Sequence, residues 1–217
     1  MLTLCKDLNG MKFDELEDYA NSLERYLKNE VKALEERHKE QTAKMTQEQK
    51  EEFYDYSSDD YIQLVESFPQ TLRVSLFVHC YSTFEHSLNE LANTMGSLRG
   101  IKITTKDLRD EGIMRAKLFF RKVVVIDFPD TQLIWNEITT LNKIRNCFVH
   151  KEGYLSEDNA KQIEIYIADS NGALKLVDDR GSKRIVIASE VFNQNVLKAF
   201  ETFNGILFKT LLADAKN

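Results

Sequence analysis

A cation, an amide and an imidazole follow one another closely in the second half of the chain. Arg145 and Asn146 are followed, after three further residues, by His150. Arginine offers paired, planar donors to phosphate oxygens, and histidine serves as a general acid or base near neutral pH. Asn146, one helical turn before His150, can orient the imidazole or bind phosphate. These three residue types fit RNA cleavage without a metal, which needs a 2′-hydroxyl deprotonated, phosphate charge stabilised and a 5′-oxygen protonated.

The element expected to carry these side chains is a helix over residues 131–150. The segment 127–130 (Asp-Phe-Pro-Asp) breaks what precedes it, and the buried side then follows helical spacing at Leu141, Ile144 and Phe148. Lys143 shares a polar face with Asn146 and His150, so it is a candidate phosphate contact. A simpler interpretation also stays open, in which Arg145 and His150 only stabilise the C-terminal end of the helix through its dipole.

This pattern resembles a known family. Arg145-Asn146-xxx-His150 resembles the Arg–polar–xxx–His motif of the HEPN superfamily, and the segment Leu76–Leu91 resembles the family's helix that packs against the motif helix. The resemblance covers residues 60–154. It implies a mainly α, HEPN-like helical bundle and a metal-independent endoribonuclease without cofactor, often a bacterial toxin or antiviral defence effector.

The resemblance also implies partners. Five helical steps set Arg145 and His150 about 140° apart on one helix, and family members pair two such helices in a two-fold homodimer. An antitoxin or another defence-system protein is a further expected partner. Two alternatives remain: a non-catalytic HEPN-like module that binds protein or RNA, and a coiled-coil-like scaffold using the helix of residues 13–53.

A second pair, Arg73 and His79, has a spacing that the family also tolerates. Six helical steps place these residues about 120° apart on their helix, and no polar residue directly follows Arg73. The prediction therefore stays with Arg145 and His150. Glu85 and His86 are possible supporting residues from the preceding helix, although a polar contact between helices explains them as well. Tyr154 is a third possible supporting residue. The alternative is that it is an exposed aromatic residue in a loop, without a role in the site.

Charge is unevenly spread along the chain. The net charge is −6, but residues 99–122 carry eight Lys or Arg against three acids, whereas residues 13–66 carry sixteen Asp or Glu against seven bases. The basic stretch, with Arg115, Lys117 and Arg121, is the candidate surface for the RNA backbone. The acidic segment is expected to be a solvated helix face.

Composition limits the class of protein. Eight glycines and two prolines in 217 residues favour long helices. Three scattered cysteines without a CxxC pair argue against a disulfide framework or a thiolate zinc site. No apolar run has a membrane-spanning length and the N-terminus lacks a signal pattern, so a soluble, cytoplasmic protein is expected.

The remaining elements follow from periodicity. We expect one domain over residues 1–217, with a long charged helix over 13–53 and a second over 60–95 that starts at the Ser57–Asp60 cluster and kinks at Pro69. Residues 113–125 should begin as a helix and then become extended through Val123–Ile126. Alternation at 163–167, followed by turns at Asn171–Gly172 and Arg180–Ser182, predicts a three-stranded antiparallel β-meander over 162–188. Ser189 should cap a last helix to about 213.

Overall fold

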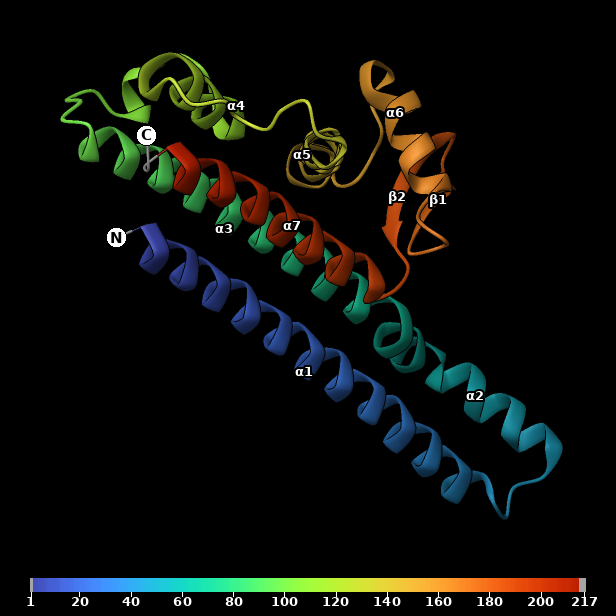
Figure 1. Cartoon of the computed structure of the whole chain (residues 1–217). Helices are drawn as coiled ribbons and strands as arrows, with labels where there is room; N and C mark the ends of the chain where they lie inside the picture. Colours follow the sequence, from blue (N-terminus) through green and yellow to red (C-terminus); the bar gives the residue numbers. More distant parts are fainter. Residues whose placement is uncertain (1, 215–217) are drawn as a thin grey trace.

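The computed structural model describes residues 2–214 and is mainly helical, as predicted. Three long helices lie side by side: α1 (Leu2–Thr42), α3 (Phe68–Leu98) and α7 (Val191–Asp214). The motif helix α5 (Leu133–Lys151) crosses α3 and α7 and is seen nearly end-on in Figure 1. The last described helix, α7, therefore packs against both α1 and α3.

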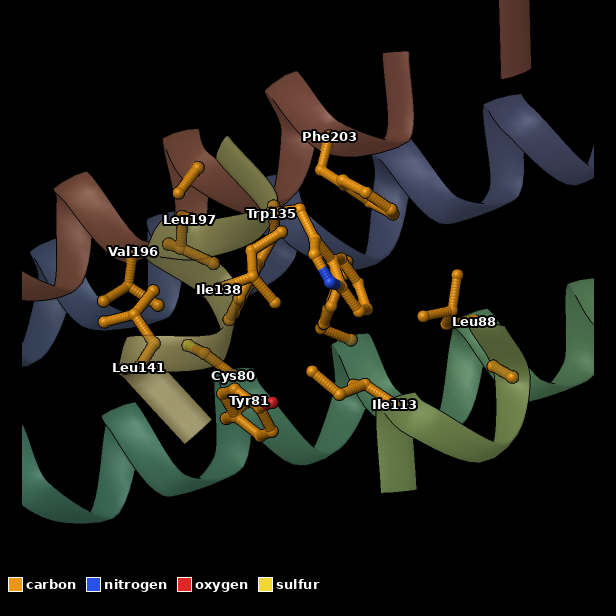
Figure 2. Close-up of a cluster of buried hydrophobic side chains, with 14 of the residues drawn as sticks. Cys80, Tyr81, Leu88, Ile113, Trp135, Ile138, Leu141, Val196, Leu197 and Phe203 are labelled. Carbon is orange, nitrogen blue, oxygen red and sulfur yellow. The ribbon is translucent and has the colours of Figure 1, made fainter. Parts of the chain in front are cut away.

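Aromatic rings fill the space between these helices. Phe84 of α3 stacks on Phe200 of α7 with ring centroids 4.3 Å apart, and Trp135 of α5 lies 5.2 Å from Phe203 of α7. Figure 2 shows Trp135 and Ile138 of α5 entering a common core with Tyr81 of α3 and Phe203 of α7. Such large buried rings supply much of the apolar area that stabilises a bundle. The motif helix is therefore anchored through its first turns.

The predicted helix over 13–53 is wrong at its end. α1 stops at Thr42, and α2 (Gln47–Ile62) begins after a tight turn. Thr46 and Gln49 exchange side-chain hydrogen bonds with each other's backbone N–H, which is a capping box that starts α2. The cluster Ser57–Asp60, predicted to begin a helix, lies inside α2 instead, because this local cap already satisfies the helix start.

The irregularity expected at Pro69 lies just before it. A π-helical segment, η1 (Gln63–Ser67), joins α2 to α3, and Pro69 occupies the first turn of α3. Proline lacks an N–H group and its ring crowds the carbonyl four residues earlier. A widened turn before Pro69 accommodates both defects.

Residues 99–132 connect α3 to α5 through short helices. A 3₁₀ turn, η2 (Thr105–Asp107), precedes α4 (Gly112–Leu118), which continues as a π-helical segment, η3 (Phe119–Val124). The prediction of an extended run ending at Ile126 is wrong. Val125 stands in the left-handed region (φ 58°) and reverses the chain, and Ile126 N–H bonds back to Phe120 O at 2.9 Å.

The predicted three-stranded meander is wrong in its first strand. β1 (Leu174–Asp179) and β2 (Ser182–Ile187) form a two-stranded antiparallel hairpin whose turn, Arg180–Gly181, was predicted correctly. The residues expected as the first strand belong to α6 (Glu157–Ala168). Asn171 and Gly172 do make a turn with positive φ, but it joins α6 to β1.

The alternation of three isoleucines explains this error. On α6, Ile163 and Ile167 lie one helical turn apart and are both buried, whereas Ile165 is 57% exposed. Glu157 and Asp158 in the first turn suit a helix start. Short apolar runs fit either period, and burial of one face against α5 decides for the helix. No helix in residues 2–214 combines the length and apolarity needed to cross a membrane.

Candidate active site

The motif helix α5 ends in a conformation that its sequence dictates. Glu152 (φ 52°) and Gly153 (φ 90°) are both left-handed, and both N–H groups bond to the carbonyl of Cys147. A Cβ on Gly153 would lie 3.2 Å from the Phe148 ring and 3.3 Å from the carbonyl oxygen of Ile185. Glycine is therefore required there, and the helix stops directly after His150 and Lys151.

The β-hairpin holds this helix end in place. Ile185 N–H bonds to Gly153 O at 2.9 Å, and Leu155 N–H bonds to Lys183 O at 3.0 Å. Tyr154 makes an antiparallel bridge with Arg184 between these bonds. Residues 153–155 thus run beside β2 like a short third strand, at a place other than the one predicted. The position of His150 is consequently coupled to the hairpin.

Arg145 ends a chain of hydrogen bonds that begins in the core. Its Nη1 donates to Asn146 Oδ1 at 3.0 Å, and Asn146 Nδ2 donates to Asn142 Oδ1 at 3.3 Å. Asn142 Nδ2 in turn donates to the hydroxyl of Tyr81 on α3 at 2.7 Å. Because a guanidinium has only donors, Arg145 fixes which end of each amide faces which neighbour. We call these four residues the polar chain.

The start of the polar chain is fully buried. Burial is the main cause that raises the pKa of the Tyr81 hydroxyl; the hydrogen bond from Asn142 opposes it, the charge of Glu85 adds to it, and the charge of Arg145 opposes it. Tyr81 therefore stays neutral and presents a fixed acceptor. The predicted supporting residue Glu85 and the predicted catalytic Arg145 act on this same hydroxyl from α3 and α5.

The structure brings some predicted site residues together and leaves others apart. Arg145 is half-buried, with an enclosed Nε that has no hydrogen-bond partner in the described chain. Asn146 contacts it. The side chain of His150 is exposed, and its imidazole forms no hydrogen bond or ion pair within residues 2–214. Within this chain, the amide is placed beside the cation and the imidazole faces solvent.

The other predicted supporting residues have contacts of their own. The carboxylate of Glu85 lies 3.2 Å from where a Cβ on Gly112 would be, so it packs against the start of α4. His86 pairs with Glu90 at 3.2 Å on the exposed face of α3. The hydroxyl of Tyr154 donates to Asp179 on β1, and its ring faces Arg184. His86 and Tyr154 therefore have local roles.

The predicted phosphate contacts lie on α5, α4 and η3, and all of them bond to neighbouring groups of the chain. Lys143 bonds to Gln162 of α6, and Arg115 Nε donates to the carbonyl of Asp110 at 2.6 Å. Lys117 and Arg121 both pair with Asp130, at 2.8 and 2.7 Å, just before α5 begins. Since α5 has 19 residues and is about 28 Å long, this ion pair lies about one helix length from His150.

The ion pairs with Lys117 and Arg121 lower the pKa of Asp130. Burial of the carboxylate raises its pKa, but the hydrogen bond and charge of Lys117 with the charge of Arg121 outweigh it, so the pKa lies below its usual value. Lys117 also lies 5.9 Å from the centre of the Trp135 ring. Both cations thus help to hold α4 against the start of α5.

The alternative pair is used elsewhere. Arg73 forms two hydrogen bonds with Glu24 of α1, at 2.6 and 2.9 Å, and a third with the carbonyl of Ala188 at 3.0 Å. Its side chain is only 14% exposed. A guanidinium committed to these acceptors has few donors left for a phosphate.

Sequence reasoning missed Tyr81 and Asn142. Asn142 precedes Asn146 by one turn, so its place beside the motif follows from helical spacing. Tyr81 stands within an apolar stripe of α3 and gave no polar signal except that buried tyrosines need a partner for the hydroxyl.

Comparison with protein-family models, curated proteins and solved structures finds no match to this chain. The function of the site is therefore inferred from its own side chains.

Proposed function

We propose that this chain is a metal-independent endoribonuclease of HEPN type. One observation carries the proposal: the polar chain from Tyr81 anchors Arg145 beside Asn146, one and a half turns before an exposed His150 at a helix end that the hairpin holds in place. A positioned phosphate ligand and an accessible acid–base group are the minimum for RNA transesterification.

The chemistry assigns a separate step to each side chain. His150 removes the proton of a 2′-hydroxyl as the 2′-oxygen attacks phosphorus and the P–O5′ bond breaks, and water protonates the leaving 5′-oxygen. In the alternative assignment, His150 protonates the 5′-oxygen and water takes up the 2′-hydroxyl proton. The remaining donors of Arg145 stabilise the charge on the phosphate oxygens. The products are a 2′,3′-cyclic phosphate and a 5′-hydroxyl. The 2′-hydroxyl makes the reaction specific to RNA.

The proposal includes a two-fold homodimer. Arg145 is turned toward α3 through the polar chain, whereas His150 is exposed on another side of α5. A second copy packed across the end of α5 would bring His150 of one protomer toward Arg145 of the other. The biological setting that we propose is a bacterial toxin or antiviral effector whose activity an antitoxin or another defence-system protein restrains.

A second candidate function is a non-catalytic module that binds RNA or protein. The exposure of His150 favours it, because catalytic imidazoles are commonly oriented by a hydrogen bond from a neighbouring group, and none is made within residues 2–214. The two candidates differ in whether RNA is cut or only bound.

The deciding experiment is RNA cleavage in the presence of EDTA. Purified wild-type protein and the variants His150→Ala and Arg145→Ala are each incubated with mixed RNA. Each substitution is expected to lower the cleavage rate by about 10²-fold or more. His79→Ala is the matched control, because His79 is an exposed histidine on α3 away from the motif. Equal turnover by wild type and both variants, all monodisperse, contradicts the enzyme and leaves the binding module.

The chemical assignment has its own test. A substrate with a single 2′-deoxy nucleotide at the scissile position should remain uncut there, and end analysis should find cyclic phosphate. Cutting at the deoxy position, or a strict requirement for magnesium, contradicts the role given to His150 even if the protein is a nuclease.

A further inference from the structure

The last two turns of α1 and the whole of α2 form a two-helix arm that extends past the bundle on the side away from α5 (Figure 1). We call this part, residues 35–62, the arm. No described residue of α2 is buried. A helix of this length on a bundle normally buries one face, so the side chains of α2 remain available for other contacts.

A cleft lies between the two helices of the arm. It has a volume of about 410 Å³ and is lined by Glu35 and His38 of α1 and by Tyr54, Ser57, Ser58, Tyr61 and Ile62 of α2. We call it the arm cleft. Its walls are mainly apolar and aromatic, and a carboxylate stands at its edge. This volume suits one or two side chains rather than a whole helix.

One wall of the arm cleft is braced from behind. The His38 ring meets Phe53 edge-on with centroids 5.1 Å apart, and Tyr54 lies 6.1 Å from His38 and 5.6 Å from Phe53. Edge-to-face packing of this kind holds rings in defined orientations. The Tyr54 wall is thus formed before any ligand arrives.

The arm has a net negative charge, with nine Asp or Glu against four Lys or Arg in residues 35–62. α2 carries six Asp or Glu against Lys50 alone, and Glu35 adds a further carboxylate at the cleft itself. Aromatic faces attract cations, and the aliphatic stem of arginine or lysine packs well on apolar walls. Nucleic acid is excluded as an occupant, since its phosphates would be repelled.

We infer that the arm cleft binds an arginine or lysine side chain of a basic, amphipathic segment in a partner protein. The stem of that side chain packs between Tyr54 and Tyr61, and its charged end meets Glu35. The neighbouring carboxylates of α2 then hold further basic residues of the same segment. This site lies outside the motif, so it does not depend on the proposed ribonuclease activity.

The test uses three synthetic 15-residue helical peptides with the same leucine stripe and with a polar face of arginine, glutamine or glutamate. Binding to the full chain is followed by NMR. The arginine peptide should bind at least tenfold more tightly than the glutamine peptide, shift the signals of Tyr54, Tyr61 and Ile62, and lose affinity as salt rises. The glutamate peptide should not bind.

Variants locate the contact. Tyr54→Ala, Tyr61→Ala and Glu35→Gln should each weaken binding about threefold or more. Tyr56→Ala is the matched control, because Tyr56 is on the same helix and 92% exposed but does not line the cleft. Circular dichroism checks that α2 persists in each variant.

Three results would overturn the inference. Equal affinity for the arginine and glutamine peptides would mean that the cleft takes apolar groups without a cation. An effect of Tyr56→Ala as large as that of Tyr54→Ala would mean diffuse attraction to an acidic helix. Shifts confined to residues outside the arm would place the site elsewhere.

Discussion

Arg145 donates a hydrogen bond to its own neighbour on α5, from Nη1 to Asn146 Oδ1 over 3.0 Å. Successive residues of a helix point about 100° apart and do not face each other, so this contact needs an external reason. The reason is the rest of the polar chain, in which Asn142 and Tyr81 turn Asn146 toward Arg145. The orientation of Arg145 thus depends on Tyr81, a buried residue of α3.

Removing the Tyr81 hydroxyl should therefore affect the site. Tyr81→Phe leaves the Asn142 amide without its acceptor, which should lower the free energy of unfolding by about 1 to 2 kcal/mol and, under the proposed function, lower kcat by about tenfold. Tyr166→Phe is the matched control, since the Tyr166 hydroxyl bonds to Glu137 at 3.2 Å, away from the motif. Denaturation and single-turnover cleavage check both; equal loss of kcat in the two variants contradicts a positioning role for Tyr81.

The adjacent cations Arg121 and Lys122 should respond differently to charge reversal. Arg121 pairs with Asp130, whereas Lys122 is exposed and makes no ion pair within residues 2–214. Arg121→Glu should lower stability by about 1 kcal/mol, and Lys122→Glu should leave it unchanged. If the basic stretch binds RNA, Lys122→Glu should still weaken binding and reduce its salt dependence. Identical melting curves for both variants would mean that the Asp130 ion pair contributes nothing.

The proposed dimer can be tested at Val149, which precedes His150 and is 43% exposed. Val149→Glu should dissociate a dimer built around the end of α5, because a carboxylate there would lose its hydration on assembly. Val177→Glu, on β1 at a similar exposure of 41%, is the control and should leave assembly intact. Analytical ultracentrifugation gives the answer; a wild-type monomer, or a dimer unaffected by Val149→Glu, contradicts this interface.

Acid should weaken the contact between α4 and α5. The folded pKa of Asp130 lies below its usual value because of Lys117 and Arg121, so its ionised form is stabilised by folding. That stability is present above the unfolded pKa of about 4 and is lost as the pH falls through the folded value. Asp130→Asn should lower stability near pH 7 by about 1 to 2 kcal/mol.

Unfolding experiments between pH 6 and 2.5 check this prediction. The Asp130→Asn protein should lose less further stability on acidification than wild type does, since it lacks the group that titrates. The exposed Asp127, three residues earlier, provides the control substitution Asp127→Asn. Parallel pH curves for wild type and Asp130→Asn would show that the titrating groups lie elsewhere.

Helical spacing was enough to predict the motif helix and the location of Arg145, Asn146 and His150 on it. Periodicity also predicted α7 and the turn at Arg180–Gly181 correctly. Both results depend on local geometry, which a short window of sequence contains. The same window misled at residues 163–167, where alternating isoleucines fit two periods and only packing against α5 chose between them.

Contacts between distant residues were beyond the sequence. Tyr81 and Asn142 are 61 positions apart, and Asp130 meets Lys117 and Arg121 across a loop whose path depends on the left-handed Val125. A count of charges therefore placed Lys117 and Arg121 on a free basic surface, whereas their shared carboxylate gives them a structural task. Pairing of this kind depends on tertiary geometry.

The central place of α7 has a consequence for the timing of synthesis. The rings of Phe77, Phe84 and Trp135 pack on Phe192, Phe200 and Phe203 of α7. A nascent chain that has not reached α7 therefore lacks the partner for each of these rings, and α5 has no complete core to rest on. Because domains complete their cores only when all packing elements have emerged, the proposed ribonuclease has no assembled site, and so no activity toward RNA, until its last described helix has been made.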